Sequence, residues 1–62
     1  MTKYYEIYIS KKRDPSDKYG IHWAKVKLPD YDEEKAIAKC DLLRLVLGES
    51  FILSMIIKTV NN

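Results

Sequence analysis

The segment KVKLPDYDEEKAIAKC, residues 25–40, contains the point at which the hydrophobic pattern changes from a strand period to a helix period. Pro29 ends the alternating pattern because it cannot donate a backbone hydrogen bond to a neighbouring strand. Asp30 follows with Glu33 three residues later, which is the spacing of a capping box with Asp in place of Ser or Thr. The segment therefore predicts a helix over residues 31–47.

Strands are predicted on both sides of this helix. Residues 3–10 (KYYEIYIS) and 20–28 (GIHWAKVKL) alternate as pleated strands do, and the polar segment KKRDPSDKYG, residues 11–20, has the composition of a turn. After the helix, Gly48 can take the left-handed conformation of a C-terminal cap. Residues 51–60 (FILSMIIKTV) are too few and too β-branched for a second helix, so we predict a third strand.

The predicted order is strand, strand, helix, strand. A right-handed crossover through the helix places the third strand on the free edge of the first and antiparallel to it. We therefore expect an α+β fold, with a three-stranded antiparallel sheet of order 2-1-3 and one helix packed on one face. The 62 residues suffice for one core, so residues 1–62 are predicted to form a single small domain.

The composition limits the classes of protein to which this chain can belong. A single cysteine, Cys40, excludes an internal disulfide. The first residues lack the apolar run of a secretory signal, and no stretch approaches the roughly 20 apolar residues of a membrane span. These features predict a cytoplasmic protein that does not enter a membrane. A core this small gives marginal stability, which favours an oligomer.

The residue usage and the element order suggest an origin. Nine of the 11 basic residues are lysines, and Ile, Tyr and Asn are plentiful, as in proteins from AT-rich genomes. A low-GC bacterium or one of its phages fits this usage. The strand-strand-helix-strand order is similar to that of several very small phage and mobile-element proteins that occlude a binding site on a host protein. This similarity is one of topology, without a shared motif, and transfers no function by itself.

The alternation assigns side chains to two faces of the sheet. The face under the helix is expected to carry Tyr5, Ile7, Ile9, His22, Ala24, Val26, Leu28, Phe51, Leu53, Met55 and Ile57. A helical row of Ala36, Cys40, Leu43 and Leu47 is suited to packing on it. Further apolar residues fall on the flanks or back of the helix: Ala38, Leu42, Leu45 and Val46. The chain thus holds more apolar side chains than one sheet and one helix can bury.

The opposite face of the sheet is the predicted contact surface. It gathers aromatic and β-branched side chains, which we expect to bind a partner: Tyr4, Tyr8, Trp23, Ile52 and Ile56. Aromatic residues supply much of the energy at protein interfaces. A homodimer is the expected assembly, with a host or cellular protein as a further partner. The third strand, guarded only by Ser54 and Lys58, offers edge-to-edge pairing as a second route to a dimer.

The basic hairpin supports an alternative function. Residues 1–29 hold seven basic and three acidic side chains, against four and six in residues 30–62. The cations that could contact phosphates of a single-stranded nucleic acid are Lys11, Lys12, Arg13, Lys18, Lys25 and Lys27. Trp23 and the tyrosines could stack on bases. Asp14 and Asp17 within the loop, and a pI of about 8.7, weigh against this reading.

Catalysis has the weakest support in the sequence. His22 and Cys40 are the one pair that could form a nucleophile and base, and a buried Cys packing as a small hydrophobe is far commoner. The carboxylates around residues 30–34 are explained by helix capping and the helix dipole. Gly20 and Gly48 stand apart, so no phosphate-binding loop is present. We expect no catalytic residues, no metal site and no cofactor, and interpret the chain as a non-catalytic interaction or regulatory module.

Overall fold

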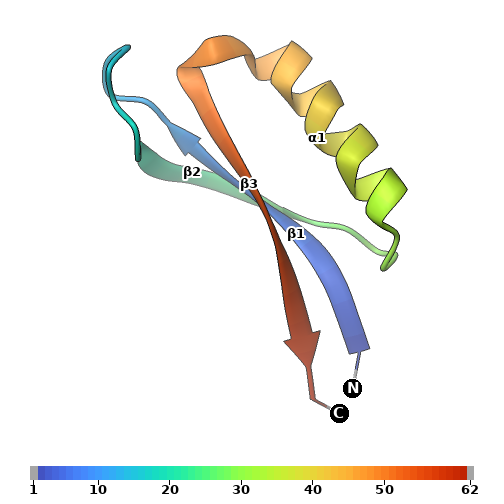
Figure 1. Ribbon diagram of the computed structural model, residues 1–62. Helices are drawn as coiled ribbons and strands as arrows, with labels where there is room; N and C mark the ends of the chain where they lie inside the picture. The colour runs from blue at the N-terminus through green and yellow to red at the C-terminus, as the bar shows by residue number, and fades with distance from the viewer. Residues whose placement is uncertain (1, 62) are drawn as a thin grey trace.

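The computed structural model describes residues 2–61 and has the predicted strand-strand-helix-strand order. The elements are β1 (Thr2–Lys11), β2 (Ile21–Lys27), α1 (Glu33–Leu47), a 3₁₀ turn η1 (Gly48–Ser50) and β3 (Phe51–Val60). The sheet order is β2-β1-β3 with both pairings antiparallel, and α1 lies on one side of the sheet (Figure 1). The α+β fold class and the strand order are confirmed.

The helix begins two residues later than predicted. Asp32, not Asp30, is the N-cap, and its carboxylate accepts a hydrogen bond from the backbone N–H of Lys35 at 3.3 Å. The Tyr31 ring stacks on Tyr5 of β1, with centroids 5.0 Å apart. Tyr31 thus lies outside the helix and against β1. Asp30 instead forms an exposed ion pair with the Lys35 ammonium at 3.1 Å.

The core lies between β1 and α1. Ile7 and Ile9 of β1 are buried, as are Ala36 and Cys40 of α1. Seven partly buried side chains pack around this cluster: Ala24, Val26, Leu28, Leu43, Leu47, Phe51 and Leu53. The predicted helical row and the predicted inward faces of β1 and β2 are confirmed at these positions. The core is small because few side chains are fully enclosed.

The helix covers only the first half of β3. Met55 and Ile57 lie on the predicted face of the sheet, paired with the inward residues Ile7 and Tyr5. The prediction that the helix covers them is wrong, because Ile57 is 53 % exposed and Met55 is exposed as well. Figure 1 shows the cause: the lower halves of β1 and β3 run past the helix and past the end of β2 as a two-stranded ribbon. Apolar side chains at the far end of β3 therefore have no cover.

A β-bulge changes the orientation of two side chains in β2. Ile9 faces Ala24, but the next residue, Ser10, faces His22, so Trp23 is the extra residue. His22 therefore moves to the outer face, where its ring meets Tyr8 edge-on. The predicted inward position of His22 and outward position of Trp23 are both wrong. The indole instead lies against Phe51, whose ring packs on the core.

The molecule is extended for its size. Its radius of gyration is 12.6 Å and its extents are 40 × 21 × 13 Å. A compact chain of this length has a radius of gyration of about 10.6 Å. The accessible surface is 4794 Å², whereas a compact monomer of 7.3 kDa exposes about 4,200 Å². The fold therefore leaves several hundred Å² exposed that a compact monomer would bury.

Candidate interaction surfaces

The outer face of the sheet, opposite the helix, carries an ordered array of tyrosines and lysines. The Lys27 ammonium lies 4.5 Å from the centre of the Tyr4 ring, and the Lys58 ammonium lies 5.5 Å from that of Tyr8. A hydrogen bond with the Tyr8 side chain, then the charge interaction with Tyr8, raises the pKa of Lys58. These contacts fix the two tyrosine rings on the surface. Both rings remain half-buried and accessible.

Four of the five predicted partner-binding residues share this face. Tyr4 and Tyr8 are even-numbered residues of β1. Ile52 and Ile56 of β3 pair with two other even-numbered residues of β1, Ser10 and Glu6, so the four side chains point to the same side of the sheet. All four are half-buried and no element of residues 2–61 covers them. The fifth, Trp23, lies on the other side of the sheet. The structure thus brings four of the predicted residues together and separates the indole from them.

A buried carboxylate lies at the centre of the outer face. Glu6 is 5 % exposed even though no element covers this side of the sheet, and its Oε1 atom has no hydrogen-bond partner. Its direct neighbours across the sheet are Lys27 and Ile56. An unpartnered buried oxygen costs stability. Alternation alone did not reveal this burial, because it comes from the large side chains around Glu6.

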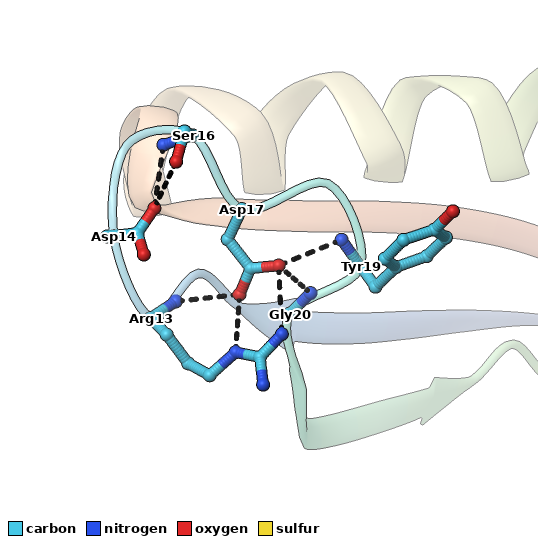
Figure 2. Close-up of polar contacts among 6 residues, drawn as sticks. All are labelled: Arg13, Asp14, Ser16, Asp17, Tyr19 and Gly20. Atoms are coloured by element: carbon cyan, nitrogen blue, oxygen red, sulfur yellow. Dashed lines mark hydrogen bonds and ion pairs between the residues drawn. The ribbon is translucent and has the colours of Figure 1, made fainter.

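The basic hairpin loop is closed by a network around Asp17 (Figure 2). Its carboxylate accepts hydrogen bonds from the backbone N–H groups of Arg13, Tyr19 and Gly20 and from the Arg13 guanidinium at 2.9 Å. The Asp17 side chain is 5 % exposed. The Arg13 interaction first, and then the backbone N–H bonds, hold the pKa of Asp17 far below its usual range. The sequence predicts that the loop aspartates hydrogen-bond the local backbone, and this is confirmed for Asp17. The ion pair between Asp17 and Arg13 was not predicted.

The same network decides which predicted cations are free to bind. Arg13 is paired with Asp17, and Lys12 is half-buried while its backbone N–H donates to Ser50. Lys11 and Lys18 are exposed near the loop. The other two predicted cations, Lys25 and Lys27, are exposed on the outer face of β2, opposite Tyr8 and Glu6. The six cations therefore divide between the loop and the outer face and do not form one continuous stripe.

A shallow hollow of about 390 Å³ lies beside the loop. Its lining combines cations with aromatic and apolar side chains: Lys11, Lys12, Arg13, Ile21, His22 and Trp23. The indole is 52 % exposed there, although it makes a T-shaped contact with the Phe51 ring. An accessible aromatic ring next to lysines is the local arrangement on which single-stranded nucleic acids stack.

The back of the helix is apolar. Leu45 is 83 % exposed, and Leu42 and Val46, which lie on the same side of the helix, are exposed as well. Lys35 and Lys39 lie seven and three residues before Leu42, so they continue the same side of the helix toward its N-terminus. The predicted apolar excess on the flanks and back of the helix is confirmed. The stripe is a second uncovered surface, separate from the outer face of the sheet.

The free edge of β3 presents unpaired backbone groups. The backbone N–H of Lys12 donates to the carbonyl of Ser50. Because hydrogen-bonded pairs alternate along an antiparallel ladder, the even-numbered residues of β3 are those whose N–H and C=O groups point toward β1. The hydrogen bond from the Leu28 N–H to the Tyr5 carbonyl shows that the odd-numbered residues of β1 direct their backbone groups toward β2. The even-numbered residues of β1 therefore bond to β3, which agrees with the pairing above. The odd-numbered residues from 51 to 59 in β3 therefore direct their N–H and C=O groups to the open edge.

The candidate nucleophile and base are separated. Cys40 is buried in the core, where burial first raises the pKa of its thiol, while His22 lies on the outer face. Residues 2–61 contain no group of His, Cys, Asp or Glu side chains arranged to hold a metal ion. Nor does any helix among them have the length and apolar character needed to cross a membrane.

No protein-family model, curated protein or solved structure matches this chain. The functional assignment therefore depends on the surfaces described above.

Proposed function

We propose that this chain is a non-catalytic protein-interaction module that works as a homodimer in the cytoplasm and regulates a host or cellular protein by binding it. The observation that carries this proposal is the uncovered apolar surface. It occurs as exposed side chains on the back of α1, on the far half of β3 and beside the hairpin loop, and as half-buried side chains on the outer face of the sheet. Contiguous exposed apolar surface in a small protein marks an interaction site.

The magnitude of the exposed area supports self-association. The surface exceeds that of a compact 7.3 kDa monomer by roughly 600 Å². If half of this excess were apolar and buried on association, the gain would be about 7 kcal/mol per subunit at about 25 cal/mol/Å². Two subunits would together gain about 14 kcal/mol, against an association cost of roughly 4 to 15 kcal/mol. A dimer is therefore energetically reasonable.

We assign the partner protein to the outer face of the sheet. Tyr4 and Tyr8 are held in place by Lys27 and Lys58, so their rings lose little conformational freedom when a partner binds. Tyrosine offers a large apolar ring and a hydroxyl that can hydrogen-bond across an interface. Ile52 and Ile56 extend the same surface. A fixed aromatic pair beside aliphatic side chains is typical of the centre of a protein interface.

Sedimentation equilibrium over a dilution series tests the homodimer. We expect a mass of twice the 7.3 kDa chain at high concentration and dissociation on dilution. A protein that keeps the monomer mass at millimolar concentration would remove the main support for the proposal.

A pull-down with two variants tests the partner-binding face. Tyr8→Ala changes the outer face, whereas Trp23→Ala changes the other side of the sheet. We expect Tyr8→Ala to release a partner that wild-type protein and Trp23→Ala both retain. Loss with Trp23→Ala alone would place the contact at the hollow beside the loop instead.

Single-stranded nucleic-acid binding is the second candidate function. The specific observation in its favour is the hollow in which the half-exposed indole of Trp23 lies beside Lys11 and Lys12. Because Trp23 is the one tryptophan of the chain, its fluorescence reports directly on stacking. This function predicts quenching by an oligothymidylate at low salt, which weakens as salt rises. An unchanged emission spectrum at low salt would eliminate it.

A further inference from the structure

We propose that two copies of this chain pair along the free edge of β3, antiparallel and centred on Ile56, to form a continuous six-stranded sheet. This inference rests on the proposed homodimer and specifies its geometry. The two-fold axis is perpendicular to the sheet and passes between the two Ile56 residues. Both α1 helices therefore lie on the same side of the combined sheet. The outer face, with its tyrosines, then becomes one surface twice as wide.

The two edges of the sheet differ in their protection. Edge strands of monomeric proteins are guarded by bulges, charges, proline or short length. β2 has seven residues, a β-bulge opposite Ile9 and Ser10, and the exposed lysines Lys25 and Lys27. β3 has ten residues in unbroken register, and its one charged residue, Lys58, lies on the outer face with its ammonium 5.5 Å from the centre of the Tyr8 ring. The edge of β3 is thus the long edge that is open to another strand, since β1 passes the end of β2 by only a few residues.

The backbone limits how two β3 strands can pair. The open edge presents the N–H and C=O groups of odd-numbered residues, so hydrogen-bonded pairs must join odd to odd. The strands overlap most, over about nine residues each, when the pairing is centred on Met55 or on Ile56. Centring on Ser54 leaves about seven paired residues, because Thr59 and Val60 then pass the start of the partner strand. Two registers remain.

The two registers differ in which exposed side chains of β3 they place opposite one another. Centring on Ile56 sets Met55 opposite Ile57 of the second copy and Val60 opposite its Ile52, so each exposed apolar residue of β3 meets another apolar residue. Centring on Met55 leaves Val60 beyond the end of the partner strand and sets Ile52 opposite Lys58. The register centred on Ile56 is therefore the better match.

Charges favour the same register. Lys58 faces Ser54 of the second copy, and the two Lys58 side chains are separated by about 14 Å along the strands. Four odd-numbered positions, 53, 55, 57 and 59, enter hydrogen-bonded pairs and together form about eight new backbone hydrogen bonds. The guarded β2 strands become the outer edges, so pairing stops at two copies.

Disulfide trapping tests the register in the full chain. In a Cys40→Ala background, Ile56→Cys places two thiols at a non-hydrogen-bonded pair on the axis, where the Cα atoms lie about 4.5 Å apart. This distance is compatible with a disulfide. Met55→Cys is the matched control, because the two Met55 Cα atoms would lie about 8 Å apart. We expect mild oxidation to cross-link Ile56→Cys at least about tenfold more than Met55→Cys, as judged on non-reducing gels.

Two lysine variants test the interface without a new thiol. Ile57→Lys places a charge at the open edge, and Leu45→Lys places one on the back of the helix; both side chains are already exposed, so both variants should fold. We expect Ile57→Lys to weaken the dimer at least about 100-fold by sedimentation, because it affects both copies. Leu45→Lys should leave the dimer intact.

The outcomes separate this inference from the proposed function. A wild-type dimer that is lost in Ile57→Lys, retained in Leu45→Lys and cross-linked through Ile56→Cys supports edge pairing. A dimer that Leu45→Lys dissociates and Ile57→Lys does not would overturn edge pairing and leave the homodimer standing. Preferred cross-linking of Met55→Cys would overturn the register. A wild-type monomer would overturn both proposals.

Discussion

The indole of Trp23 packs edge-on against the ring of Phe51, with centroids 5.0 Å apart and planes at 68°, on the helix side of the sheet. The two residues belong to β2 and β3, which are separated by β1. Their contact spans the sheet above Lys11, the β1 partner of Phe51. The bulge in β2 produces this contact, because a regular strand would direct Trp23 to the other face.

A double-mutant cycle measures the contact. We expect Trp23→Leu and Phe51→Leu to show a coupling free energy of about 1 kcal/mol in denaturant unfolding, as edge-to-face aromatic pairs do. Trp23→Leu and Tyr8→Leu form the control cycle, and their effects should add because the two rings lie on opposite faces. Coupling in the control cycle and none in the first would show that Trp23 lies on the outer face.

The sequence predicted the strand order, the helix end at Leu47 and the inward residues of β1, because alternation and helical spacing report these features directly. It did not predict the bulge, since no residue type in residues 21–24 marks an extra position. The orientations of His22 and Trp23 depend on that one register shift. The late start of the helix accompanies a tertiary contact, the stacking of Tyr31 on Tyr5. Local patterns contain neither signal.

We expect the stability of the protein to depend on pH in the acidic range because of Asp17. Its pKa is lowered in the folded state, mainly by the Arg13 interaction, so it stabilises the fold above its unfolded pKa of about 4. This contribution is lost as pH falls below about 4 towards the folded pKa. We therefore expect Asp17→Asn to lower the melting temperature at pH 7, with the gap to wild type narrowing below pH 4.

Asp14→Asn is the matched control for this loop. Asp14 accepts hydrogen bonds from the backbone N–H and hydroxyl of Ser16 but has no ion pair with Arg13. Its substitution should change the melting temperature less than Asp17→Asn does. An equal loss for the two variants at every pH would contradict the central role of Asp17.

Gly20 is required by the hairpin for two reasons. Its φ is +70°, and a Cβ atom at this position would lie 2.9 Å from the Ser10 Cβ and 3.0 Å from the Lys11 carbonyl oxygen. We expect Gly20→Ala to reduce the free energy of unfolding by at least about 2 kcal/mol, from backbone strain and crowding together. Gly20→Asn separates the two causes, because Asn tolerates positive φ but still carries a Cβ atom. Comparable losses in both variants identify crowding, and a near-neutral Gly20→Asn would rule crowding out.

Glu6 is expected to cost the isolated protein stability. Its Oε1 atom is buried without a hydrogen-bond partner in the middle of the proposed partner-binding face. An apolar side chain of similar volume removes that penalty, so Glu6→Met should increase the free energy of unfolding by about 1 kcal/mol. Glu6→Ala is the control: it removes the carboxylate but leaves a void between Tyr4 and Tyr8, and should not stabilise. If Glu6→Met instead destabilises the protein, the carboxylate is satisfied within the fold, and the lysines around it are its partners.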